Sequence, residues 1–340
     1  MHYNIFCIMK KKSLVFLFVP TLLLQPTAVL SESDIPEQPR SLEDRVQEIL
    51  DYYYMSEDNV SISYYNTVSR ETYHFHDERY MFAASTYKLP LNMYYYMKQN
   101  AGELNDDSMI NGYRLADAHY LSIVNSDNDA SEALMNGLGT YKQYKDLMMT
   151  TFGDDYYRDL NNVDPALYRD NDYPAGYLMN VLQYLYEHQS DFQQLLEYMS
   201  SPDQINGVAR TIPEDIKIYQ KQGWYTNVNT VAEIVMAEQP YLAVIMIDDP
   251  SGNSINALAN LNSTIYSYTK ETTAYMNALQ PQNHRNTDVF ESKTDGMTRL
   301  HTQKDPFKIT VFYGTLVLLC IDIYLTIRSI RSQKRKDRHH

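Results

Sequence analysis

Residues 82–97 have the sequence FAASTYKLPLNMYYYM, an apolar approach that leads to Ser85 and then into a predicted helix. Lys88 follows three residues later, and positions i and i+3 lie on one face of a helix. A serine hydroxyl is a poor nucleophile unless a neighbouring base takes its proton. A buried lysine can be that base, because burial lowers its pKa. This stretch therefore predicts Ser85 as a nucleophile and Lys88 as its base.

The spacing Ser-x-x-Lys is weak evidence by itself, because it occurs about once by chance in a chain of this length. Ser267 and Lys270 have the same spacing inside a predicted amphipathic helix, where a solvated polar face is the simpler interpretation. The assignment of Ser85 therefore depends on two further motifs. Residues 126–128, Ser-Asp-Asn, stand on a predicted turn before a helix that begins near residue 130. Residues 221–223, Lys-Gln-Gly, stand at the end of a predicted strand.

In this order, Ser-x-x-Lys, Ser-Asp-Asn and Lys-x-Gly resemble the penicillin-recognising serine enzymes, and most closely the class A β-lactamases. The resemblance covers about residues 41–280. It implies acyl transfer, in which Ser85 attacks the carbonyl of a strained amide or an ester. Lys88 would accept the serine proton, directly or through water.

The resemblance also implies roles for the other motif residues. Ser126 and Lys221 would relay a proton to the leaving nitrogen, and Asn128 would bind the amide of the substrate's side chain. The backbone N–H groups of Ser85 and Trp224 would hold the oxyanion. Losing one such donor typically lowers the rate by about 10²–10³.

Two positions near Trp224 bear on substrate binding. Gly223 follows a strand, where glycine often marks a close approach of ligand to backbone. Gln222 departs from the family, which has Thr or Ser there to hold a substrate carboxylate. The family often adds an arginine behind this strand; Arg210 is a candidate, with a plain surface charge as the alternative.

The residue that hydrolyses the acyl-enzyme is a second departure. Class A β-lactamases use a glutamate in an E-x-x-L-N loop, and this chain has no such glutamate. The nearest sequence is Asp164-Pro-Ala-Leu-Tyr. Aspartate is one methylene shorter, which would displace the water by ~1 Å and can cost about 10²-fold in rate. Asp164 is therefore either the deacylation base or a turn residue before the proline.

The order of predicted elements is a helix, a strand hairpin, a long helical region, three strands and a closing helix. A cap pair, Ser41 and Asp44, opens the first helix. The sequence therefore predicts an α+β fold, in which terminal helices flank an antiparallel sheet and an all-helical lobe is inserted. The expected elements are a helix at 41–55, strands at 60–64 and 71–75, helical residues to about 210 including 175–198, strands at 216–220, 231–236 and 241–248, and a helix at 255–279.

The regions outside this domain carry signals for export and membrane attachment. Within residues 1–31, a basic start at Lys10–Lys12 followed by an apolar run predicts a signal peptide, with an uncleaved anchor as the alternative. Residues 308–328 predict a transmembrane helix, and the basic residues at 329–340 predict a cytoplasmic C-terminus. A linker at 32–40 and a polar spacer at 281–307 would join these regions to the catalytic domain at 41–280.

Composition narrows the range of partners. The formal net charge is −14, and basic residues gather at both ends, so we expect no nucleic acid partner. The two cysteines, Cys7 and Cys320, lie outside the predicted domain, which excludes a disulfide there. His74 and His76 have no evident third ligand, and we expect neither a metal nor a cofactor.

The sequence thus predicts a membrane-tethered, extracellular serine acyl hydrolase with a monomeric catalytic domain, acting on a β-lactam or a cell-wall peptide. One alternative is a peptidase of the D-Ala type or an esterase acting on cell-wall material. Another is a module that binds penicillin or wall peptide without turnover. The missing glutamate favours slow deacylation.

Overall fold

The computed structural model describes residues 37–201, 208–209 and 212–279. The predicted signal peptide, spacer, transmembrane helix and tail lie outside these residues, and so does Arg210. Among the described residues, no helix combines the length and the apolar character needed to cross a membrane.

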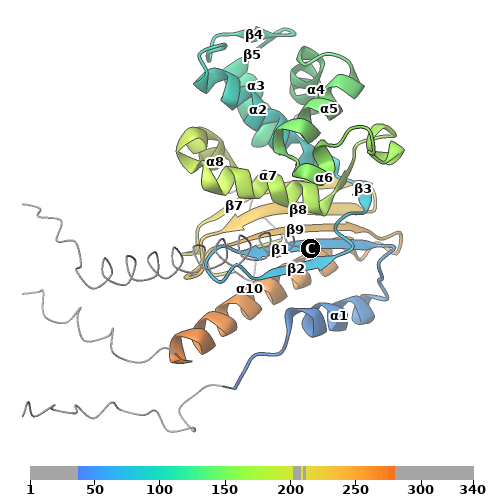
Figure 1. Ribbon diagram of the computed structural model, residues 1–340, viewed down its shortest axis with the longest axis vertical. Helices are drawn as coiled ribbons and strands as arrows, with labels where there is room; N and C mark the ends of the chain where they lie inside the picture. The colour runs from blue at the N-terminus through green and yellow to red at the C-terminus, as the bar shows by residue number, and fades with distance from the viewer. Residues whose placement is uncertain (1–36, 202–207, 210–211, 280–340) are drawn as a thin grey trace, which may run out of the picture. The chain divides into compact units, whose positions relative to one another are not determined.

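Strands from the beginning and the end of the domain form one antiparallel sheet (Figure 1). The sheet order is β2-β1-β9-β8-β7, so the first hairpin pairs with the last strand. This topology confirms the predicted α+β class, because the helical region is inserted between the two groups of strands. The strands are β1 (Val60–Asn66), β2 (Thr72–Phe75), β7 (Ile218–Tyr225), β8 (Val228–Val235) and β9 (Tyr241–Asp248).

The terminal helices, α1 (Leu42–Tyr53) and α10 (Ser254–Leu279), pack against each other on one face of the sheet (Figure 1). The predicted cap is present, since Ser41 Oγ accepts a hydrogen bond from Asp44 N at 3.1 Å. Apolar side chains of both helices form a core with the sheet. The two ends of the domain therefore support one face of the sheet.

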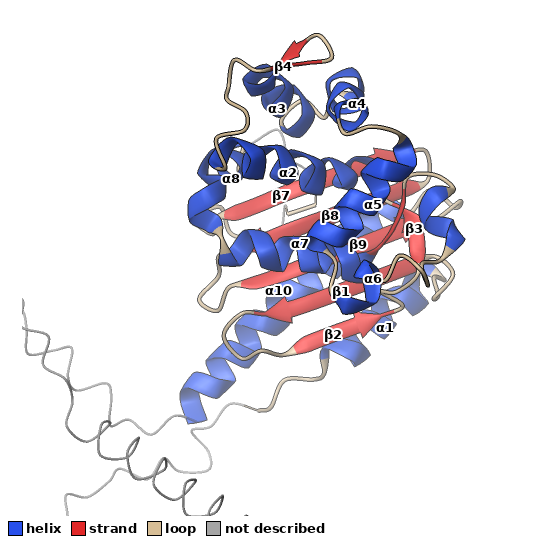
Figure 2. Cartoon of the chain, turned by 45° about the horizontal axis from the view of Figure 1, so that its top comes forward, coloured by secondary structure: helices blue, strands red, loops and turns tan. Residues whose placement is uncertain are grey.

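The helical region lies on the other face, where α7 covers the sheet (Figure 2). Helix α2 is almost entirely buried in its first half, which holds the chain just before it firmly in place. The helices are α2 (Lys88–Asn100), α3 (Leu115–Ile123), α4 (Asn128–Gly137), α5 (Tyr141–Phe152), α6 (Asp155–Arg158), α7 (Ala175–Glu187) and α8 (Gln193–Met199), with 3₁₀ turns η2 (Ala84–Tyr87), η3 (Pro165–Tyr168) and η4 (Gln189–Phe192).

Three predictions about secondary structure are wrong in detail. The helical region is not all-helical, because β3 (Tyr80–Phe82) pairs with β6 (Asp172–Pro174), and β4 (Met109–Ile110) pairs with β5 (Tyr113–Arg114). The helix expected at 175–198 is divided between α7 and α8 by a polar stretch that begins at His188. Strand β7 does not end before the Lys-Gln-Gly motif but continues through it to Tyr225, because pairing with β8 extends to the turn.

Candidate active site

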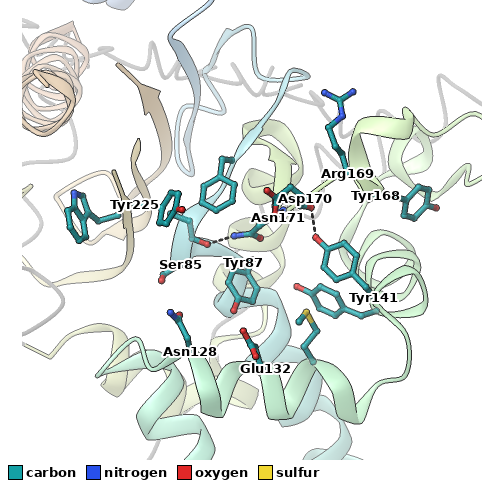
Figure 3. A pocket seen from close by; sticks show the side chains of 15 residues that line it. Ser85, Tyr87, Asn128, Glu132, Tyr141, Tyr168, Arg169, Asp170, Asn171 and Tyr225 are labelled. Atoms are coloured by element: carbon teal, nitrogen blue, oxygen red, sulfur yellow. Dashed lines mark hydrogen bonds between the residues drawn. The ribbon is translucent and has the colours of Figure 1, made fainter. Parts of the chain in front are cut away.

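Ser85 lies in the 3₁₀ turn η2, directly before α2 (Figure 3). Contacts from β8 and from the segment before β6 hold this turn. The preceding residue, Ala84, has a φ of +47°, which a non-glycine residue adopts only when its surroundings enforce it. Asn171 Nδ2 donates to Ala84 O at 2.6 Å, and Thr230 Oγ1 donates to Ala83 O at 2.8 Å. Hydrogen bonds from β8 and from the segment before β6 therefore hold the turn that carries the predicted nucleophile.

Lys88 is the first residue of α2, and its side chain is completely buried. Its Nζ donates to Ser126 O at 2.5 Å and to Asn128 Oδ1 at 2.8 Å. Burial lowers the pKa of Lys88 to about 8, although the charges of Asp127 and Glu132 raise it. Within the described residues no hydrogen bond joins Lys88 Nζ to the Ser85 hydroxyl, and catalytic hydrogen bonds are often long before substrate binds. The low pKa suits a proton acceptor.

Ser126, the first residue of the second motif, lies between Lys88 and Lys221. Its φ is +53°, and the next residue, Asp127, caps α4 by accepting from Ala130 N at 2.8 Å. Ser126 Oγ accepts from Lys221 Nζ at 3.0 Å and lies 3.5 Å from Lys88 Nζ. The structure thus joins residues from α2, the α3–α4 turn and β7 in one hydrogen-bonded group.

Lys221 and Gly223 face this group from β7. Lys221 is 1% exposed, and burial, together with the charge of Lys88, lowers the pKa of Lys221 to about 7. A Cβ on Gly223 would lie 2.6 Å from Ser85 N and 2.4 Å from Thr230 Oγ1, closer than packing allows. Glycine is needed here because β7 passes directly over the nucleophile turn.

A buried polar network below the site was not predicted. Asn92 Nδ2 donates to Lys88 O at 2.7 Å and to Ser122 Oγ at 2.8 Å. Ser131 Oγ donates to Asp127 O at 2.5 Å and lies 2.9 Å from Ser122 Oγ. These bonds tie α2, α3 and α4 together, so they fix the Ser126 turn relative to Lys88. Single polar residues inside apolar helices are the only sequence signal of such a network.

A pocket of about 440 Å³ opens beside Ser85 (Figure 3). Asn128 and Glu132 enter it from α4, and Arg169, Asp170 and Asn171 enter from the loop before β6. The remaining wall is largely aromatic, with Phe82, Tyr87, Tyr141, Tyr144, Tyr168, Trp224 and Tyr225. The pocket therefore combines the Ser85 hydroxyl with apolar walls and a few polar groups, as ligand sites usually do.

Sequence comparison identifies the family of this chain. A model of the beta-lactamase enzyme family matches residues 41–269, which include all three motifs. The chain belongs to the β-lactamase enzyme family. The resemblance predicted from the motifs is thereby confirmed. No curated protein matches the sequence.

Several solved structures share the fold of this chain at low identity. A β-lactamase from Xanthomonas campestris pv. campestris is 16% identical, with a TM-score of 0.55 over 67% of this chain and 97% of its own. PBP-A is 17% identical, with a TM-score of 0.57 over 70% and 99% of the two chains. The class A β-lactamase of the last common ancestor of Gram-negative bacteria is 15% identical, with a TM-score of 0.56 over 68% and 100%.

Asp164 caps the N-terminus of the 3₁₀ turn η3. Its carboxylate accepts from Ala166 N at 2.7 Å and opens η3. It is not among the described residues that line the pocket. This position matches the turn-residue interpretation, and the role of Asp164 as a deacylation base stays a prediction.

The loop after Asp164 approaches the site through a residue that was not predicted. Asn171 bonds Ala84 O through its side chain, while its own carbonyl accepts from Ala83 N at 2.8 Å. Behind the loop, Lys145 is completely buried and donates to Asp172 O at 2.9 Å. Asn171 stands seven residues after Asp164 and belongs to no motif. It reaches Ser85 only through the pairing of β3 with β6, which a local sequence pattern does not reveal.

The remaining predicted residues flank the pocket in this β-lactamase family chain. Trp224 lines it and is 73% exposed, whereas Gln222 is half-buried on β7 and is not among its lining residues. Their roles in holding the oxyanion and the substrate stay predictions. His74 and His76 contact separate carboxylates, Asp77 at 2.7 Å and Glu57 at 3.0 Å.

Proposed function

We propose that this chain is a serine acyl hydrolase that opens β-lactam amides through an acyl-enzyme on Ser85. The observation that carries the proposal is the position of Ser126 Oγ, 3.0 Å from Lys221 Nζ and 3.5 Å from Lys88 Nζ. Attack on an amide needs a proton acceptor for the nucleophile and a proton donor for the leaving nitrogen. Two buried amines joined through one hydroxyl can supply both.

The acylation step follows from these contacts. Ser85 Oγ attacks the lactam carbonyl carbon, and its proton passes to neutral Lys88 Nζ, directly or through water. With a pKa of about 8, roughly a tenth of Lys88 is neutral at pH 7, far more than for an exposed lysine. The carbon–nitrogen bond breaks as Ser126 Oγ gives its proton to the nitrogen and takes one from Lys221. Water then hydrolyses the Ser85 ester to release the ring-opened acid.

The pocket and one relative support a β-lactam as the substrate. Aromatic rings such as Phe82, Tyr87 and Tyr225 offer apolar contact to an acyl side chain, and Asn128 offers an amide. A leucine-to-glutamate variant of PBP-A, which shares 15% identity and a TM-score of 0.57 with this chain, is known as an acyl-enzyme with penicillin G.

A second candidate is a penicillin-binding module that is acylated but not hydrolysed. The cap formed by Asp164 favours it, because that carboxylate is engaged in its own turn. A peptidase or an esterase of cell-wall material would use the same acylation group. The lifetime of the acyl-enzyme separates these candidates from a β-lactamase.

We also infer that the protein is exported and anchored by a single C-terminal helix, with the catalytic domain outside the membrane. The apolar segment at 308–328 and the basic residues at 329–340 support this orientation, and the signal at 1–31 supports export. The domain would then meet β-lactams and cell-wall peptides directly. Protease added to intact cells should digest the domain and spare the C-terminal tail.

The test of the proposed activity is an intact-mass time course of the full chain mixed with penicillin G. A β-lactamase gives an adduct that forms and decays within minutes, whereas an adduct stable for hours indicates a penicillin-binding module. Ser85→Ala should form no adduct. Labelling of the Ser85→Ala variant at another serine would contradict the assigned nucleophile, and no adduct on the wild type would contradict β-lactam acylation.

A further inference from the structure

The carboxylates around Ser85 differ in whether they already accept a hydrogen bond from the protein. Asp127, Asp164 and Asp170 each accept a hydrogen bond from a backbone N–H of their own turn, at 2.7–2.8 Å. No hydrogen bond and no salt bridge within the described part of the chain engages the Glu132 carboxylate. Glu132 is therefore the acidic side chain of this group that is available to a water.

Glu132 also has a suitable position. It lies on α4, four residues after Asn128, and i and i+4 share one helix face. Both side chains line the pocket that contains Ser85, and Figure 3 shows them directed from α4 toward Ser85 and Tyr87. The Glu132 charge acts on Lys88 and on Tyr87, raising the pKa of each, which places it close to the acylation group.

We propose that Glu132 is the general base that activates the hydrolytic water against the Ser85 acyl-enzyme. The inference rests on the proposed function. The water oxygen attacks the ester carbon while one water proton passes to the Glu132 carboxylate. The bond between this carbon and Ser85 Oγ then breaks, Oγ takes up the proton from Glu132, and the carboxylic acid leaves. Both side chains return to their starting states.

The neighbours of Glu132 suit this step. A carboxylate only accepts hydrogen bonds, so a water bound to it can turn a lone pair toward the ester. Burial, and then the charge of Glu132, raise the pKa of Tyr87 to about 12. The Tyr87 phenol therefore stays protonated at neutral pH and adds no second negative charge beside Glu132.

The experiment compares acylation and adduct decay in full-length variants by rapid-quench intact mass with penicillin G. Glu132→Gln should be acylated within about threefold of the wild-type rate, while its adduct should decay on the order of 10²–10⁴ times more slowly. Glu132→Asp, which keeps a shortened carboxylate, should decay faster than Glu132→Gln. Asp129→Asn removes an exposed charge from the same helix outside the pocket, and its adduct should decay as in the wild type.

The outcomes separate the two proposals. Decay of the Glu132→Gln adduct at the wild-type rate would overturn the role of Glu132 and leave β-lactam acylation intact. Trapping of the adduct by Asp164→Asn alone would assign the base to Asp164 and overturn the inference. A wild-type adduct that never decays would overturn it as well. Absence of any wild-type adduct would instead refute the proposed function.

Discussion

The two parts of the site, one proposed to be acylated and one proposed to hydrolyse the acyl-enzyme, are built in different ways. The acylation half, Ser85, Lys88, Ser126 and Lys221, joins two buried amines through one hydroxyl. The proposed hydrolytic half, the loop 164–171 with Glu132, is partly exposed, and its aspartates accept hydrogen bonds within their own turns. In the acylation half, Lys88 and Lys221 are buried and hydrogen-bonded to Ser126, so each of these positions tolerates few residue types. On the open wall of the pocket, a carboxylate can be supplied by a different element of the fold.

The largest expected effect falls on the acylation half, at Gly223. Gly223→Ala puts a methyl group 2.6 Å from Ser85 N and 2.8 Å from Ala83 O, so either β7 or the nucleophile turn must move. Because a 1 Å displacement at a reacting centre can cost about 10²-fold, we expect the acylation rate to fall by about 10²–10³. Stopped-flow kinetics with a chromogenic cephalosporin measure it.

Gly112→Ala is the matched control for Gly223→Ala. Gly112 has open space around its Cβ position but a φ of +92°, so the substitution should cost about 1 kcal/mol of stability through backbone strain. Its acylation rate should stay at the wild-type value. Equal loss of acylation in both variants would mean that general destabilisation, not contact with Ser85, explains the effect.

The pH dependence of acylation tests whether Lys88 is the base. A base must be neutral, so the acylation rate should fall as pH drops below the Lys88 pKa of about 8. Between pH 8 and pH 6 the neutral fraction falls about 50-fold, and the rate should follow. Glu132→Gln removes a charge that raises this pKa, so its profile should move to lower pH. A profile that is flat over this range would argue against Lys88.

A smaller effect is expected at Asn171, where the two halves meet. Asn171→Ala removes the hydrogen bond to Ala84 O, so the strained turn before Ser85 loses one support. We expect about a tenfold lower acylation rate, equivalent to about 1.4 kcal/mol. Asn161→Ala, on the exposed part of the same segment, should leave acylation unchanged. If Asn171→Ala slows only adduct decay, the two halves are independent.

Much of the fold could be predicted because its signals are local. Short apolar segments predicted all five strands of the sheet: alternation indicated the strand at 60–64, and the apolar run at 241–248 matches β9 at both ends. The end of β7 was missed because Lys221 and Gly223 interrupt the apolar pattern, yet cross-strand pairing carries the strand on to Tyr225. The end of α7 before His188 was missed because the helical patterns on both sides of it read as one long helix.

The sequence by itself determined the family and predicted the acylation residues, because buried charges and a glycine against the Ser85 turn tolerate few replacements and so leave motifs. Only the tertiary structure decided how the hydrolytic half is arranged. The β3–β6 pairing brings Asn171 to Ala84, and the α4 packing turns Glu132 into the pocket. Neither residue stands in a motif, because their proximity to Ser85 comes from packing between segments far apart in the chain.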